Sequence, residues 1–392
     1  MHVRCKRKQQ SNFMFLFDRR PVPYCTSYKY LGCSIHEHLD YDHTVDLLAD
    51  AAGRALGSII TKMIKNGGFP YNVFCTLYQA CVCSIADYGG EVFGFEKYDS
   101  AQKIHLRAAR SFLGVNKTTT IVGIISEFNL LLPQYRSQLR MIRQYHRMLK
   151  LSDKNMARKI FIWDKNLNDQ NQIQSWNSEV RTIFNDNGML NIFESENIFV
   201  LKEIIEKLNT SMLKRQQAIV KDQCLISPKL RTFVKFKDFF KTPTYITKPL
   251  SFIQRKFLAK FRLGCLEIRI ETGRYARPRL PAEARLCQIC TNAEQRIEDE
   301  YHFIFECKTY EHERSLWIHK MELPTNFETE TTEKKFDLVL NEPKNVKLTA
   351  QFLINIFDTR SKIVNNLPST NNPVSLFHLS PQEQCPACNI DQ

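Results

Sequence analysis

Three cysteines and a histidine near the end of the chain have a spacing that could coordinate a metal ion. Two residues lie between Cys287 and Cys290, eleven between Cys290 and His302, and four between His302 and Cys307. A C-x2-C pair lets two thiolates reach one ion from a tight turn, and an imidazole with a third thiolate completes a tetrahedral set. Because four protein ligands leave no position for water, the sequence predicts a structural zinc site and not a catalytic one.

Two other groups could hold metal, and we expect neither to do so. Cys385 and Cys388 form half a ligand set close to the C-terminus, with His378 as the nearest histidine. Asp42, Asp46 and Asp50 are spaced by four and share a helix face near His43, which a metal-dependent nuclease could use. We expect these acids to be solvated near a helix N-terminus, where the helix dipole favours negative charge. For the 287–307 set, the alternative is four reduced side chains in an acidic loop.

Positive charge is concentrated in two stretches of the chain. Lys and Arg number 55 against 41 Asp and Glu, a formal net charge of +14. Residues 101–160 hold twelve Lys/Arg against two acidic residues, and residues 229–280 hold fourteen against three. Two basic blocks in an otherwise mildly acidic chain indicate a polyanionic partner, with RNA or DNA first and a membrane surface second.

Within these blocks, nine cations are the candidate phosphate contacts. Five recur at helical spacings of four and three, so they share one face of a helix expected over 134–151. The remaining four precede the cysteines. The candidates are Arg136, Arg140, Arg143, Arg147, Lys150, Arg269, Arg274, Arg277 and Arg279. The alternative is a solvated basic face. Trp163, Trp176 and Trp317 could stack on bases, whereas most of Phe233, Phe236, Phe239 and Phe240 are expected in the core.

The hydrophobic pattern predicts a mainly α-helical fold. Residues 13–17 and 27–36 are expected to form one small β-hairpin. Apolar residues then recur every three to four positions. Helices are expected from about 45 to 65 and over 72–86, 99–113, 134–151 and 197–221, with a linker around 164–190. The expected order of domains is a hairpin (1–40), a helical domain (41–165), a helical linker region (166–228), a basic connector (229–283), a zinc-knuckle module (284–325), C-terminal helices (326–363) and a disordered tail (364–392).

Composition excludes several classes of protein. Hydrophobic residues make up 43% of the chain, which is too many for wholesale disorder. No stretch approaches the length of a membrane span, and the N-terminus does not resemble a signal peptide. Thirteen cysteines are an odd number for a disulfide framework. We therefore expect reduced thiols in the nucleus or cytoplasm and no membrane partner.

Several segments, taken in order, resemble the C-terminal half of reverse transcriptases from LINE-class (non-LTR) retrotransposons. Residues 27–32 (SYKYLG) are similar to the hairpin that closes the palm of those polymerases, and residues 88–90 (YGG) to the end of their thumb segment. Residues 108–115 (AARSFLGV) resemble an Arg-x-Phe-Leu-Gly stretch, and residues 270–278 (IETGRYARP) precede the cysteines as in many such elements. The Cys/His set with Tyr310 and Arg314 is similar to their terminal CCHC zinc knuckle. The resemblance covers roughly residues 13–360.

The resemblance implies nucleic-acid binding without polymerisation. Polymerases of this family hold two metal ions with palm carboxylates that include an aromatic-x-Asp-Asp turn, and no Asp-Asp dipeptide occurs in this chain. We therefore expect a non-catalytic portion that binds RNA or DNA, and whose partner could be the missing polymerase domain of a longer parent. The alternatives are a zinc-stabilised interaction or scaffold protein, a metal-dependent nuclease, and a relic with no selected role.

Overall fold

The computed structural model describes residues 1–4, 6–171, 175–290 and 296–366, and this part of the chain is mainly helical, as expected. Cys385, Cys388, His378 and the tail expected over 364–392, from residue 367 onward, lie outside the described residues. None of the described helices is both long and apolar enough to cross a membrane.

The chain divides into two compact units that are not consecutive in sequence. Unit 1 comprises Met1–Leu56, Leu77–Arg107 and Leu130–Gln216, and unit 2 comprises Gly57–Thr76, Ala108–Asn129 and Gln217–Gln392. Three long helices, α1, α5 and α11, contribute residues to both units. Each unit is therefore assembled from separate stretches of the sequence.

Unit 1 begins with two short antiparallel hairpins rather than with the single expected one. They are β1 (Leu16–Phe17) with β2 (Arg20–Pro21), and β3 (Ser27–Tyr30) with β4 (Cys33–His36). Each is closed by a two-residue turn with positive φ, at Asp18 and Arg19 (48° and 59°) and at Leu31 and Gly32 (45° and 90°). Such turns match the twist of paired strands, so each strand pairs with its immediate neighbour and residues 13–17 do not reach residues 27–36.

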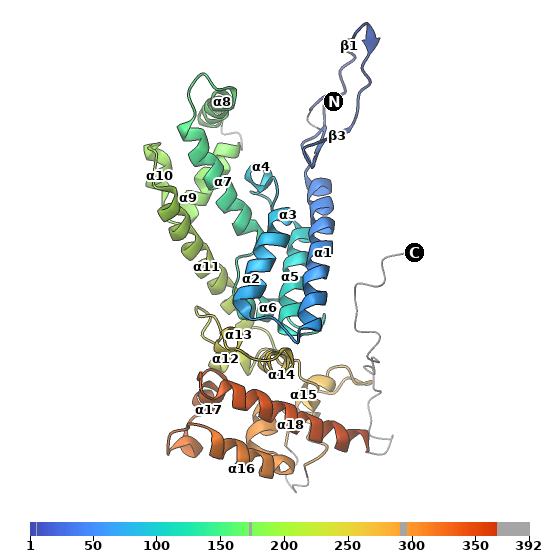
Figure 1. Cartoon of the computed structure of the whole chain (residues 1–392), viewed down its shortest axis with the longest axis vertical. Helices are drawn as coiled ribbons and strands as arrows, with labels where there is room; N and C mark the ends of the chain where they lie inside the picture. The colour runs from blue at the N-terminus through green and yellow to red at the C-terminus, as the bar shows by residue number, and fades with distance from the viewer. Residues whose placement is uncertain (5, 172–174, 291–295, 367–392) are drawn as a thin grey trace. The chain divides into compact units, whose positions relative to one another are not determined.

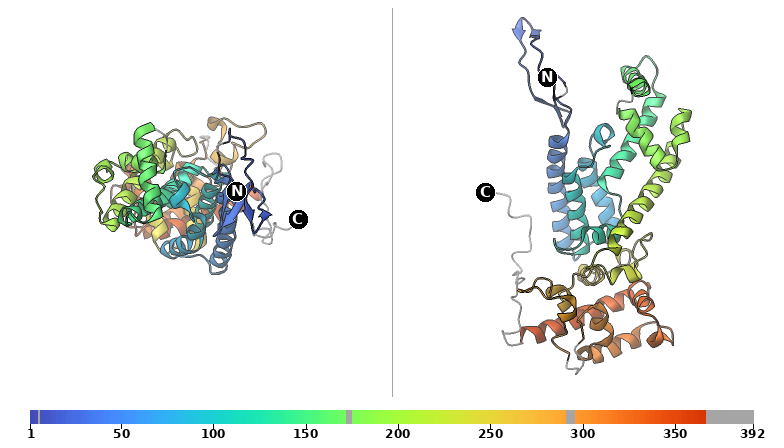
Figure 2. Two further views of the ribbon diagram at one scale, coloured as in Figure 1. Left: turned by 90° about the horizontal axis from the view of Figure 1, so that it is seen from above. Right: turned by 180° about the vertical axis from the view of Figure 1, so that it is seen from behind.

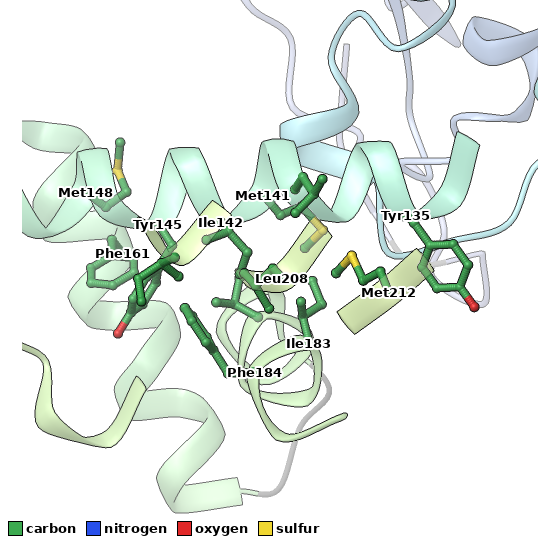
Figure 3. Packing of buried hydrophobic residues seen from close by; sticks show 13 residues of the cluster. Tyr135, Met141, Ile142, Tyr145, Met148, Phe161, Ile183, Phe184, Leu208 and Met212 are labelled. Carbon is green, nitrogen blue, oxygen red and sulfur yellow. The ribbon is translucent and has the colours of Figure 1, made fainter. Parts of the chain in front are cut away.

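The helices of unit 1 follow the hairpins. They are α1 (Asp42–Lys65), the π-helix η1 (Tyr78–Cys83), α3 (Ser84–Ala86), α4 (Gly90–Phe93), α5 (Asp99–Leu113), α7 (Pro133–Lys150), α8 (Met156–Asn171), α9 (Trp176–Asp186), α10 (Leu190–Ser195) and α11 (Leu201–Leu225). Figure 3 shows one core of the unit, where Ile142 and Tyr145 of α7 meet Phe184 of α9 and Leu208 of α11. The edge-on contact of Tyr145 with Phe161, at 5.8 Å between ring centroids, attaches α8 to the same core.

The polar segment around 164–190 is mostly helical. The expectation of a linker there is therefore wrong for most of its length. Ser175 caps α9, because its hydroxyl accepts a hydrogen bond from the Ser178 N–H and Ser178 returns one to the Ser175 N–H. Val180 and Phe184 are fully buried on the inner face of this helix. Capping and a buried apolar stripe therefore outweigh the polar composition.

Unit 2 combines shorter helices with one long C-terminal helix. They are α2 (Tyr71–Leu77), α6 (Ile121–Phe128), α12 (Phe233–Phe236), α13 (Thr244–Thr247), α14 (Phe252–Arg262), α15 (Arg269–Thr272), η2 (Ala282–Ala284), η3 (His302–Glu306), η4 (Lys308–Tyr310), α16 (Glu311–Lys320), η5 (Phe327–Thr329), α17 (Thr332–Leu340) and α18 (Val346–Asn365). Helix α18 packs against α14 and α16 (Figure 1). Trp317 of α16 stacks on Phe352 of α18 with ring centroids 4.2 Å apart.

A buried ion group lies at the centre of unit 2. Arg262 of α14 donates two hydrogen bonds to the Glu127 carboxylate of α6, at 2.9 and 3.1 Å. The Lys237 ammonium lies 3.7 Å from the same carboxylate, and the three side chains are each no more than 1% exposed. Arg262 and Lys237 of the 229–280 block are therefore internal counter-ions and not surface charges.

Candidate metal centre

Three of the four predicted ligands come together in unit 2. One ligand atom each from Cys287, His302 and Cys307 lies within 4.8 Å of the others, and this is the group of His, Cys, Asp or Glu side chains in the described residues that could hold a metal ion. Cys290 is half-buried and does not belong to this group. Nor do Asp42, Asp46 and Asp50, so the structure does not support the nuclease alternative.

A short hairpin-like pairing positions Cys287. Leu286 and Ile297 form an antiparallel bridge, and the Cys287 N–H donates to the Arg296 carbonyl at 2.8 Å. In the next pair, the Glu298 N–H donates to the Arg285 carbonyl at 3.0 Å. These bonds fix the backbone on both sides of the pairing and so direct the Cys287 thiol.

A π-helical turn positions the other two ligands. His302 begins η3 and Cys307 follows it, and the Cys307 N–H donates to the His302 carbonyl at 2.8 Å. This i→i+5 bond closes a wider turn than that of an α-helix. It therefore brings together two residues at the H-x4-C spacing. The H-x4-C spacing alone does not distinguish this turn from an ordinary α-helix.

The surroundings of the imidazole fit a metal ligand. His302 is 2% exposed, and neither of its ring nitrogens has a hydrogen-bond partner. A buried polar atom without a partner is costly, and a bound ion would satisfy one nitrogen. The Glu306 carboxylate lies 3.6 Å from the Nδ1 atom of His302. The same carboxylate is paired with Arg296 at 2.9 Å.

The electrostatics of the group favour an anionic sulfur. A hydrogen bond from Cys287 lowers the pKa of Cys307, and burial, which raises it, is the smaller effect. Burial lowers the pKa of His302, but its contacts with Cys307 and Glu306 outweigh burial and raise that pKa. A thiolate is the form that binds metal, and the hydrogen bond that favours it at Cys307 raises the pKa of Cys287. Cys287 would therefore lose its proton on binding a soft or borderline divalent ion such as zinc.

Acidic residues beside the ligands attach them to the rest of unit 2. The Glu298 carboxylate accepts two hydrogen bonds from Arg360 of α18, at 2.8 and 2.9 Å, and one from the Arg269 N–H at 2.6 Å. Glu300 pairs with Arg231 at 2.6 Å. The sequence contains an acidic run at 298–300, but it does not show that Glu298 and Glu300 pair with arginines elsewhere in the chain.

The cations of the 229–280 block are consequently divided between internal and exposed positions. Arg274 pairs with Glu271 at 2.9 Å, and the Arg269 side chain is half-buried beside Glu298. Arg277 and Arg279 are exposed, and within the described ranges neither has a carboxylate partner. Two of the four candidate phosphate contacts in this block are therefore accessible without breaking an ion pair.

Helix α7 shows the same division. Arg136 donates to both oxygens of Asp87, at 2.8 and 2.9 Å, and to the Leu131 carbonyl, so this residue is a structural counter-ion rather than a free cation. Arg140 is half-buried, while Arg143, Arg147 and Lys150 are exposed. No carboxylate partner for these four occurs in the described part of the chain. The cations at the C-terminal end of α7 are therefore accessible to a ligand.

The candidate stacking residues also divide into exposed and buried side chains. Trp163 is 63% exposed, whereas Trp176 donates its indole N–H to the Glu91 carbonyl and Trp317 is buried against Phe352. Phe233, Phe236 and Phe239 are core residues, as expected, and Phe240 is 56% exposed.

Comparison with known proteins gave no match: no family model, no curated protein and no solved structure is similar to this chain at a significant level.

Proposed function

We propose that the chain binds RNA or DNA without catalysis, as the thumb-to-knuckle portion of a LINE-class reverse transcriptase would. The observation that carries this proposal is the run of Arg143, Arg147 and Lys150 on α7. These three cations share one helix face, are exposed, and have no carboxylate partner among the described residues. Cations with no internal counter-ion are available to neutralise phosphates.

The length of this run suits a nucleic-acid strand. Seven residues separate Arg143 from Lys150, which is about 10 Å along an α-helix. One strand of a duplex carries about three phosphates over that length of helix axis. Arg140 and the exposed pair Arg277 and Arg279 supply further contacts. Arg136 and Arg274 act as positioning residues, because a carboxylate pairs with each guanidinium group. Arg269 bonds to Glu298 through its backbone N–H.

The proposed metal is zinc, bound by Cys287, His302 and Cys307, with Cys290 as the fourth ligand. Zinc supplies folding free energy at such a site and takes no part in a reaction. Glu298 and Glu300 hold the ligand-bearing segment against Arg360 and Arg231.

The test is a salt titration of binding. Anisotropy of labelled 20-nucleotide single-stranded RNA and of a duplex would be measured with the full chain between 50 and 200 mM KCl. Each phosphate contact contributes about 0.9 to the slope of log K against log salt on a duplex. We expect the triple variant Arg143→Ala, Arg147→Ala, Lys150→Ala to lower that slope by two to three such increments.

The matched control is the pair Lys202→Ala and Lys207→Ala on α11, which are also exposed helical cations in unit 1. An unchanged slope in this control, with a reduced slope in the triple variant, supports the proposal. A wild-type affinity that does not depend on salt, or equal losses in both variants, contradicts it.

A further inference from the structure

The N-terminal ribbon, defined as residues 13–36, exposes more apolar surface than a soluble element normally does. Five consecutive residues, 13–17 (FMFLF), are between 56 and 79% exposed. Tyr28, Tyr30 and Leu31 are 57, 57 and 74% exposed. Successive residues of a strand point to opposite sides, so Leu16 and Phe17 of β1 lie on opposite faces of the ribbon, whereas Tyr28 and Tyr30 of β3 share one face and Lys29 lies on the other. Apolar patches this large on a protein surface mark a binding site.

The ribbon is also basic, most of all at its tip. The turn at Asp18 and Arg19 places Arg19 and Arg20 at the end of the β1–β2 hairpin, and Lys29 lies in β3. These three cations are exposed and, within residues 1–4 and 6–171, have no carboxylate partner in the structure. In Figures 1 and 2 the β1–β2 end lies farthest from α1, with β3–β4 between them.

Two other occupants fit these features poorly. A bilayer interior requires every backbone N–H and C=O to be paired within the protein, and a two-stranded ribbon has two open edges. A second copy would bring like charges together, since residues 1–37 hold seven Lys/Arg against two acidic residues. The positive charge therefore favours a polyanionic partner. That partner must also offer apolar surface to the exposed side chains of the ribbon.

A duplex of DNA offers both. Its major groove admits a two-stranded β-ribbon, with phosphates along each rim. In the minor groove, apolar side chains can enter between base steps and kink the duplex. The grooves of A-form RNA are either too narrow for side chains or too shallow for this mode of entry. A ribbon with exposed apolar side chains and with cations at its tip can make both kinds of contact.

We propose that residues 13–31 form an arm that enters a groove of duplex DNA, with Arg19, Arg20 and Lys29 on phosphates and Leu16 or Phe17 wedged between base pairs. This inference rests on the proposed nucleic-acid binding and adds a contact site and a ligand preference to it. The wedge unstacks one base step, and the energy for this comes from the contacts that the bent duplex gains.

The test measures unstacking separately from affinity. The full chain would be titrated into 20-base-pair DNA duplexes that carry 2-aminopurine at successive positions, whose fluorescence rises when a neighbouring base unstacks. We expect wild type to raise the fluorescence at one or a few positions. The variant Leu16→Ala, Phe17→Ala should lose most of this rise while retaining binding, and Arg19→Ala, Arg20→Ala should lower the salt slope by about two contacts.

Ile226→Ala is the control for the apolar change, because Ile226 is 82% exposed and lies outside the ribbon. Salt-dependent binding with no fluorescence rise, or a rise that the Leu16/Phe17 variant retains, overturns the arm and leaves the proposed function standing. Equal unstacking of an A-form RNA duplex also overturns it. Failure of wild type to bind any nucleic acid overturns the proposed function itself.

Discussion

Glu298 and Arg360 form a two-pronged ion pair, with N–O distances of 2.8 and 2.9 Å, that joins the segment bearing Cys287 to helix α18. Both side chains are at most 8% exposed, and Glu298 also accepts the N–H of Arg269. One carboxylate thus connects the metal-binding segment, the basic block and the last helix. The candidate metal centre is in this way part of the fold of unit 2 and not a separate module.

This relationship predicts a large effect of Arg360→Met on stability. The substitution leaves the Glu298 charge buried without its partner, which costs about 3–5 kcal/mol of unfolding free energy. Urea denaturation followed by circular dichroism would measure this loss. Lys362→Met is the control, since Lys362 is exposed and its i,i+4 pair with Asp358 contributes less than about 0.5 kcal/mol. Equal effects of the two variants would show that the buried pair has no special role.

Cobalt substitution tests the ligand set. Co²⁺ in place of zinc should give a tetrahedral visible spectrum with sulfur-to-metal bands, and these should weaken in Cys287→Ser and Cys307→Ser. Cys290→Ser should weaken them as well if Cys290 completes the set. Cys81→Ser, which alters an exposed cysteine of unit 1, should leave the spectrum unchanged. A chain that binds no metal by elemental analysis, and that a chelator does not destabilise, would contradict the zinc proposal.

Arg136 and Arg147 lie on the same face of α7 but should behave differently when mutated. Arg136→Ala removes the partner of Asp87, which is 4% exposed, and should destabilise the fold by about 3 kcal/mol. Arg147→Ala should leave stability within about 0.5 kcal/mol, because exposed substitutions rarely do more. Only the second should reduce the salt slope of binding in the fully folded protein. A reversed pattern would mean that the roles of the two arginines are exchanged.

Lys237 should make the stability of the protein depend on alkaline pH. Burial lowers its pKa to about 8, despite the nearby Glu127 carboxylate. Below pH 8 Lys237 is charged in both the folded and the unfolded state. The whole free-energy cost of burying its ammonium group, relative to the neutral amine, therefore destabilises the folded state there. Between pH 8 and the unfolded value of about 10.4, the unfolded chain binds more protons, so stability rises with pH. The total is about 3 kcal/mol, from the shift of the pKa.

Lys237→Met should therefore raise the unfolding free energy near pH 7 by about 1–3 kcal/mol, an advantage that shrinks toward pH 10. Arg262 still pairs with Glu127 in this variant. The measurement is urea unfolding of wild type and variant at several pH values, with Lys235→Met as the exposed control. A constant difference between pH 7 and pH 10 would show that Lys237 does not titrate in this range.

Periodicity and spacing in the sequence were enough to predict the helical class and most long helices. Leu139 and Ile142 share the buried face of α7, because apolar residues at helical spacing leave water together. Spacing also indicated Cys287, His302 and Cys307 as a group that could hold a metal ion, although the fourth predicted ligand, Cys290, does not belong to that group. These are local regularities, and a short window of sequence contains them.

Only the tertiary structure separated the cations that are neutralised from those that are free. Arg136 and Arg147 have the same spacing on the same face, yet Asp87 lies 49 positions from Arg136 in sequence and pairs with it. Arg262 finds Glu127 across 135 positions. Ion pairing depends on distance in space and on burial, and neither is encoded in the local pattern of charge. For the same reason the sequence predicted a basic surface, but the fold decided which of its charges remain available.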